Sequence, residues 1–219
     1  KDDLELEIKN FKLRKKINVL KLSELKKYKL NNKKINIIDV NRKLSSNQKS
    51  SSQLDIIYIN QCFDIAFKLI KNGFTSKFIN GPINKKLFLN KKFLGITEYI
   101  ANIFKHKKVG MLIYNKELSV CPITTHLPIS LVAKKITKKL ILEKIIIINT
   151  FFKKNLKFKP KIGVAGLNPH CESILKFNED EKIVSSAVKS AIKKKVDVKG
   201  PFSANAIFLK KNRKKFNVI

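Results

Sequence analysis

A strand-like apolar run leads directly into a histidine in the stretch KIGVAGLNPH, residues 161–170. The same arrangement recurs in LSVCPITTHLP, residues 118–128, where His126 follows the apolar run. A helix-like pattern comes after each of these segments. Strands that alternate with helices over short connections predict an α/β protein, with a mostly parallel or mixed sheet and helices on both faces.

His126 and His170 are the strongest candidates for a ligand site. In open α/β sheets, ligands bind at the carboxyl ends of the strands, where the following helices present unpaired N–H groups. Neutral imidazole is a common ligand of divalent cations, so two imidazoles at two strand ends can converge on one metal ion. The alternative is that each is a loop histidine hydrogen-bonded to backbone. A catalytic zinc site has three protein ligands, so another ligand would have to come from elsewhere.

The rest of the chain supplies further helices and strands. Three segments show the apolar period of a helix, namely 57–71, 140–154 and 179–195. Strand-like runs are expected at 35–40, 74–80, 109–114 and 118–123, and a β-like alternation at Leu4, Leu6 and Ile8. The polar, serine-rich residues 44–53 predict a loop, and Thr97 is expected to be the N-cap of a helix over 98–105.

A second candidate site is the Gly-Pro turn GPINK, residues 81–85. Such a turn is usually only a turn, but at a strand end it could hold the Lys85 ammonium at the ligand edge of the sheet. There Lys85 could pair with a carboxylate or phosphate. The sequence contains no G-x-G-x-x-G pattern, P-loop or G-x-S-x-G elbow, so a Rossmann-type dinucleotide site is not expected.

The formal net charge of +32 is carried almost entirely by lysine, since only three of the 48 basic residues are arginine. Bidentate recognition of phosphates and bases favours arginine, and the lysines are spread along the chain. We therefore expect no nucleic-acid partner, with a basic nucleic-acid-binding protein as the alternative from another class. No apolar run reaches the roughly 18 residues that a membrane helix needs. Three widely spaced cysteines fit a cytoplasmic protein.

Four segments then occur in order: GPINK at 81–85, TTHLP at 124–128, VAGLNPH at 164–170 and GPFSA at 200–204. Together they resemble the 4-hydroxythreonine-4-phosphate dehydrogenase family of pyridoxal phosphate biosynthesis. The resemblance implies a fold like that of isocitrate and isopropylmalate dehydrogenases, in which two α/β/α lobes enclose the active site. It also implies a homodimer that completes this site across its interface.

The resemblance further implies the chemistry of the site. NAD or NADP would be held by loops, and one divalent metal (zinc, magnesium or cobalt) would be bound by His126 and His170. The third ligand would come from a Tyr-His-Asp-Gln-like segment beyond residue 219. The implied substrate is 4-phosphohydroxy-L-threonine, whose secondary alcohol is oxidised before carbon dioxide leaves. In this reaction Lys85 is the catalytic candidate, in contact with anionic groups of the substrate, and Thr97 binds substrate.

The chain departs from the family pattern at two positions. Ile96 stands where the family commonly has a substrate-contacting histidine, and Asn205 where an aspartate is often seen. A paralogous dehydrogenase of 4-phospho-D-threonate or 4-phospho-D-erythronate is therefore the alternative enzyme. Because the sequence starts at Lys1 and stops within an apolar run at Ile219, we expect residues 1–219 to be one inactive fragment of the two-lobed enzyme, with no lobe boundary that can be placed.

Overall fold

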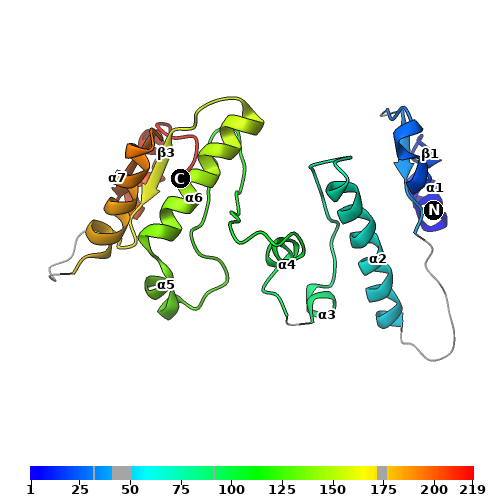
Figure 1. The fold of residues 1–219 in the computed structure, drawn as a ribbon, viewed down its shortest axis with the longest axis horizontal. Coiled ribbons are helices and arrows are strands. Elements are labelled where there is room, and N and C mark those ends of the chain that lie inside the picture. The colour runs from blue at the N-terminus through cyan, green and yellow to red at the C-terminus, as the bar shows by residue number, and fades with distance from the viewer. Residues whose placement is uncertain (32, 41–50, 91, 172–176) are drawn as a thin grey trace. The chain divides into compact units, whose positions relative to one another are not determined.

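The computed structural model describes residues 1–31, 33–40, 51–90, 92–171 and 177–219. The contacts divide the chain into two compact units, Lys1–Lys92 and Phe93–Ile219, and each is described by itself (Figure 1). Both units combine helices with parallel strand pairs, as expected for an α/β protein. Within the described ranges, no helix has the length and apolar character needed to cross a membrane.

A parallel strand pair lies near the start of the first unit. Strand β1 (Lys16–Val19) pairs with β2 (Lys34–Ile37), and a short 3-10 helix, η1 (Leu22–Lys27), connects them. The predicted strand at 35–40 is thus confirmed for residues 35–37 only, since β2 ends at Ile37. The strand predicted from the alternation of Leu4, Leu6 and Ile8 is wrong, since these residues belong to helix α1 (Asp2–Asn10). The acidic residues in the first turn of α1 interact favourably with its positive N-terminal end.

Helix α2 (Ser51–Lys71) supplies the core of the first unit, together with the short helix α3 (Lys85–Leu89). Phe63 and Phe67 are buried, and the ring centroids of Phe63 and Phe88 lie 5.0 Å apart. The predicted helix over 57–71 is confirmed but begins earlier. Residues 51–53 of the predicted loop are therefore helical, while 44–50 lie outside the described residues.

The strand predicted at 74–80 is not formed, because local hydrogen bonds replace it. The hydroxyl of Thr75 accepts a hydrogen bond from the backbone N–H of Lys77 at 3.1 Å, a local pairing that competes with a strand ladder. The segment leads into Asn84, whose side chain caps α3 by accepting from the N–H of Leu87 at 3.2 Å. Lys85 is therefore the first residue of α3.

A mixed sheet organises the second unit. Strand β3 (Ile162–Ala165) pairs in parallel with β4 (Val198–Phe202). Val218 adds a parallel bridge to Ile162 on one side and to Ser119 on the other. The strands predicted at 109–114 and 118–123 shrink to the antiparallel bridge between Ile113 and Val120. The α/β class expected from the sequence is confirmed, and among the described residues β3 lies between β4 and the bridge at Val218.

The helices of the second unit include both long ones predicted from the apolar period. The two predicted helices are α6 (Lys138–Phe151) and α7 (Ser186–Lys193). The other helices described in this unit are α4 (Ile96–Ile103), α5 (Ile129–Lys135), α8 (Ala204–Ile207) and α9 (Lys210–Arg213). Single π-helical stretches, η2 (Phe152–Leu156) and η3 (Asp180–Ser185), extend α6 and precede α7. The expected N-cap at Thr97 is wrong: Gly95 is the N-cap of α4, and Thr97 lies in its first turn.

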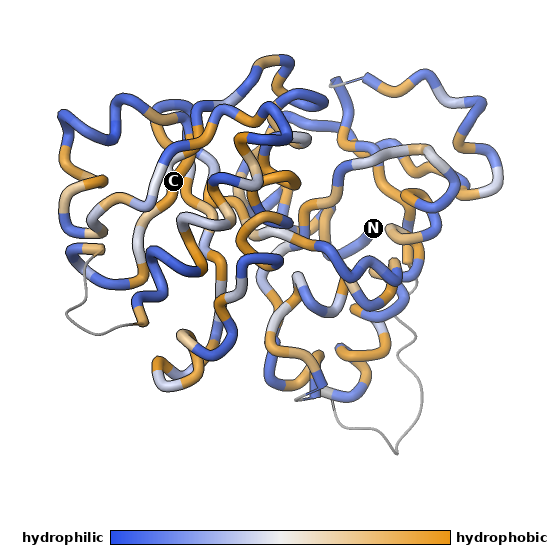
Figure 2. Tube along the Cα trace, turned by 60° about the vertical axis from the view of Figure 1, so that its left-hand side comes forward, coloured by the Kyte–Doolittle hydropathy of each residue, from blue (hydrophilic) through white to orange (hydrophobic). Residues whose placement is uncertain are grey.

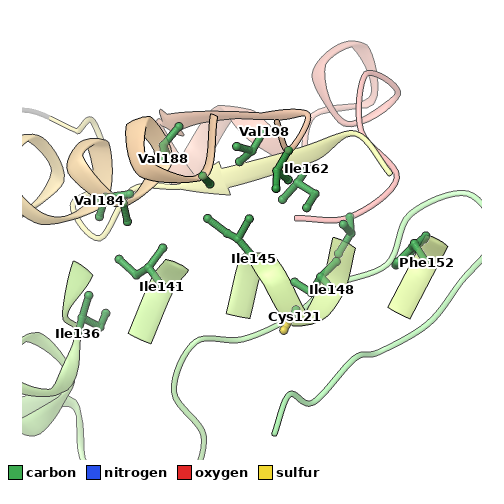
Figure 3. Close-up of a cluster of buried hydrophobic side chains, with 14 residues drawn as sticks. Cys121, Ile136, Ile141, Ile145, Ile148, Phe152, Ile162, Val184, Val188 and Val198 are labelled. Atoms are coloured by element: carbon green, nitrogen blue, oxygen red, sulfur yellow. The ribbon is translucent and has the colours of Figure 1, made fainter. Parts of the chain in front are cut away.

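The core of this unit forms where α6 packs against α7 and β3. Figure 3 shows Ile141, Ile145 and Ile148 of α6 on one side of the core, with Ile162 and Val184 opposite. Along the helices, hydrophobic residues recur between hydrophilic ones (Figure 2), as amphipathic helices require. The helices thus fix β3, and with it the segment that carries His170.

Candidate metal and substrate site

The loop that carries His170 is fixed to the core by a buried aspartate. Asp180 of η3 has no exposed surface, and its Oδ1 accepts a hydrogen bond from the N–H of Leu167 at 2.5 Å. Its Oδ2 accepts from the backbone N–H and the side-chain amide of Asn168, at 2.9 and 3.1 Å. Three donors thus satisfy the carboxylate, as a buried anion requires. Sequence reasoning did not identify Asp180.

The same loop is held from its other side by the segment GPFSA, residues 200–204. The hydroxyl of Ser203 donates to the carbonyl of Pro169 at 2.7 Å, and the N–H of Gly166 donates to the carbonyl of Phe202 at 2.8 Å. Two of the four motifs in the sequence are therefore in direct contact. Gly200 makes this approach possible, because its φ is +142° and a Cβ there would lie 2.5 Å from the carbonyl oxygen of Val164.

Both histidines are accessible. His170 ends the loop after β3, and His126 lies in the loop before α5 with a φ of 56°, a left-handed conformation that histidine adopts more readily than most residues. Both side chains are exposed. Among the described residues, neither imidazole forms a hydrogen bond to another group, so within that part of the chain neither is a loop histidine bonded to backbone.

A cavity of about 310 Å³ is lined by residues that precede both histidines, but neither His126 nor His170 is among its lining residues. Its wall includes residues 120–124, which lead to His126, and residues 162–167, which lead to His170. The remaining wall is mostly apolar, and α6 contributes Ile141 and Ile145 to it. The structure therefore brings the beginnings of both motifs to one place, although they are about forty residues apart in the sequence.

Two polar or ionisable side chains, Lys144 and Cys121, also line this cavity. Lys144 donates from Nζ to the carbonyl of Val109 at 2.5 Å. Burial raises the pKa of the Cys121 thiol, and the nearby charge of Lys144 opposes this effect. We assign Cys121, which is buried in the core, to the packing of the wall.

The donor chemistry of the histidine pair fits a divalent cation. Two unpaired imidazoles on loops that start at one cavity are suitable ligands. Within the described ranges, no group of three or more histidine, cysteine, aspartate or glutamate side chains is assembled. A metal held by His126 and His170 thus remains a prediction. His106 follows α4 and is exposed among lysines, as expected of a solvated surface residue.

The remaining predicted site residues fall in different units. Lys85 is exposed at the start of α3 and belongs to the first unit, whereas Thr97 is half-buried in the first turn of α4 and belongs to the second. Ile96 precedes Thr97 as the first residue of α4. Asn205 is exposed in α8. The roles of Lys85 and Thr97 remain predictions.

Comparison with known proteins gives the family. A family model described as pyridoxal phosphate biosynthetic protein PdxA matches residues 4–219. The chain belongs to the PdxA family. The 4-hydroxythreonine-4-phosphate dehydrogenase of a Sulfurihydrogenibium species is 31% identical over 178 residues, which cover 80% of this chain and 54% of that protein. The D-threonate 4-phosphate dehydrogenase of Salmonella typhimurium is 27% identical over 168 residues, 75% of this chain and 51% of that protein.

A solved PdxA-family structure shares the fold. The crystal structure of 4-hydroxythreonine-4-phosphate dehydrogenase from Klebsiella pneumoniae superposes with a TM-score of 0.77 at 23% identity, covering 94% of this chain and 64% of that one. This likeness concerns the fold alone. The chain spans only about half the length of the curated PdxA relatives that it matches.

Proposed function

We propose that the protein containing this chain is an NAD-dependent, metal-assisted dehydrogenase of 4-phosphohydroxy-L-threonine in pyridoxal phosphate biosynthesis. The secondary alcohol is oxidised by hydride transfer to NAD, with release of a proton. The resulting β-keto acid then loses carbon dioxide to give 3-amino-2-oxopropyl phosphate. The observation that carries the proposal is the cavity at which both histidine motifs begin, in a chain of the PdxA family.

His126 and His170 are the residues that would hold the divalent cation. When bound, a cation of this kind supplies Lewis-acid stabilisation of negative charge on the hydroxyl and carboxylate oxygens of the substrate. The two imidazoles are exposed, so they can reach a ligand without rearrangement of the core.

The other roles concern substrate binding. The hydroxyl of Thr97, in the first turn of α4, would donate a hydrogen bond to a polar group of the substrate. Lys85 is an exposed ammonium at the start of α3 and would pair with the phosphate or carboxylate. The excess of lysine over acidic residues adds a positive field that attracts such an anionic substrate.

The finer architecture is part of this proposal. We propose the two-lobed fold of isocitrate and isopropylmalate dehydrogenases, a homodimer that completes the site, loop-bound NAD or NADP, and a cytoplasmic location. The two compact units, Lys1–Lys92 and Phe93–Ile219, are compatible with a two-lobed enzyme. The likeness of fold to a PdxA-family crystal structure supports the same architecture.

Turnover by the full-length protein tests the proposal. With 4-phosphohydroxy-L-threonine, NAD and Zn²⁺, Mg²⁺ or Co²⁺ supplied in turn, NADH should form with at least one metal, and a chelator should abolish it. An absence of NADH above a substrate-free blank with every metal would contradict the proposal.

A second candidate substrate follows from Ile96. An aliphatic side chain at the start of α4 cannot accept a hydrogen bond from the substrate's ammonium group, as a neutral histidine can, so a substrate that lacks an amino group, such as 4-phospho-D-threonate, fits this position better. The Salmonella relative named for that activity makes the comparison practical. A higher kcat/KM for 4-phospho-D-threonate than for 4-phosphohydroxy-L-threonine would select this candidate.

A further inference from the structure

We infer that Asp180 is a positioning residue for His170, because its carboxylate holds the loop from Gly166 to His170 in the conformation that presents the imidazole. This inference deepens the proposed function and rests on it, since it assigns Asp180 to one ligand of the proposed metal site. Asp180 itself is fully buried, so it acts through the loop and does not contact a substrate.

Asp180 occupies a buried position in its helix, and its carboxylate accepts hydrogen bonds only from the loop among the described residues. Val184, Ala187 and Ala191 follow it at helical spacing on the same buried face. An apolar side chain would fill such a position without the cost of burying a charge. The three N–H donors from Leu167 and Asn168 offset this cost, and hydrogen bonds to an ionised acceptor are about twice as strong as neutral ones.

The loop is built to receive this carboxylate. A Cβ on Gly166 would lie 2.4 Å from Sγ of Cys171 and 3.1 Å from Oδ1 of Asp180, so the glycine permits the close approach of both side chains. On the opposite side, the hydroxyl of Ser203 holds the carbonyl of Pro169. The backbone is thus anchored on both sides immediately before His170.

This anchoring matters because the imidazole has no support of its own. The His170 side chain is exposed and, within the described part of the chain, unpaired. The preceding backbone therefore fixes the position of the His170 Cα–Cβ bond, from which the imidazole reaches a ligand. Groups that orient metal ligands in this way commonly change metal affinity by about 10- to 100-fold when they are removed.

The test compares Asp180→Asn with Glu181→Gln in the full-length protein. Asp180→Asn keeps the shape of the side chain but replaces one acceptor oxygen by an N–H₂ group, which faces a donor. Glu181→Gln is the matched control, because Glu181 is an exposed neighbour and the change in charge is the same. Co²⁺ is the probe, since its affinity and its visible absorption bands both report the ligand geometry.

We expect Asp180→Asn to weaken Co²⁺ binding about 10- to 100-fold, to shift the Co²⁺ bands at saturation, and to speed amide hydrogen exchange over residues 166–171. Glu181→Gln should change none of these. If Asp180→Asn does not fold, Ser203→Ala, which frees only the Pro169 carbonyl, carries the test with an expected loss of several-fold in Co²⁺ affinity. Wild-type affinity and bands in the variant that folds would overturn the inference.

Failure of the proposed function has a different signature. If the wild-type protein binds no Co²⁺, Zn²⁺ or Mg²⁺, the proposed metal site is contradicted whatever Asp180 does. Amide hydrogen exchange then tests only whether Asp180 holds the loop, independently of metal binding. Faster exchange over residues 166–171 in Asp180→Asn supports the anchor, and unchanged exchange overturns it.

Discussion

Individual residues in the second unit are constrained by close backbone approach, and Gly200 is the clearest case. Its φ is +142°, and a Cβ added there would lie only 2.5 Å from the Val164 carbonyl oxygen, which excludes other residues without a shift of β3 or β4. We expect Gly200→Ala to destabilise the protein by about 1–3 kcal/mol from backbone strain alone, measured by urea unfolding.

Gly110→Ala is the control for this prediction. A Cβ at Gly110 would make an ordinary contact of 3.6 Å with Ile147, so its stability should stay close to that of the wild type. Equal stabilities for Gly200→Ala and the wild type would show that β4 does not approach β3 as described.

Residues of the site were predictable from the sequence to different degrees. The sequence placed His126 and His170 in loops because each follows an apolar run and belongs to a motif, and the structure has both in loops. Asp180 was missed because it sits among other acidic residues, Glu179 and Glu181. The signal was present in its register: Asp180 occupies the apolar stripe of its helix with Val184 and Ala187, and a charge at a core position calls for a partner.

Elements were predictable where a long apolar period repeats, as in α2, α6 and α7. Short segments failed because local interactions decide them. Alternation of Leu4, Leu6 and Ile8 imitates a strand, but helix α1 forms. At 74–80 the Thr75 turn replaces a strand. The strand pair around 115 is reduced to one bridge because Val120 and Ser119 are paired to different neighbours, which no local pattern encodes.

The start of α6 allows a test at this scale. The hydroxyl of Thr137, the N-cap, accepts from the N–H of Leu140 at 3.2 Å. Thr137→Ala should lower the free energy of unfolding by about 1 kcal/mol, measured by urea denaturation. Thr150 lies exposed in the same helix, so Thr150→Ala should be close to neutral. A neutral Thr137→Ala would show that this cap does not stabilise α6.

For the molecule as a whole, the charge of +32 is the feature most open to misreading. We attribute it to dispersed lysines and not to a nucleic-acid surface. Duplex DNA should therefore show no binding tighter than the micromolar range at 150 mM salt, as measured by fluorescence anisotropy, with any binding at low salt lost as salt rises. Sequence-selective, nanomolar binding at 150 mM salt would contradict this attribution.

The family, unlike the details of packing, could be recognised from four short motifs, because glycine, proline and histidine at fixed positions encode turns and ligands. Two of these motifs, around His170 and Ser203, prove to be in contact, and two lead from one cavity. The sequence alone could not show these contacts, since they depend on how β3, β4 and the segment at 120–124 assemble.

Metal binding by histidine variants of the full-length protein tests the central claim most directly. The three histidines of this chain provide the design: His126→Ala and His170→Ala each remove a proposed ligand, and His106→Ala removes an exposed residue of the same type. We predict that the wild type and His106→Ala bind about one divalent ion per chain, measured by calorimetric titration with Zn²⁺, and that the other two lose at least about 10-fold in affinity. Equal Zn²⁺ affinity in all four proteins would contradict the account.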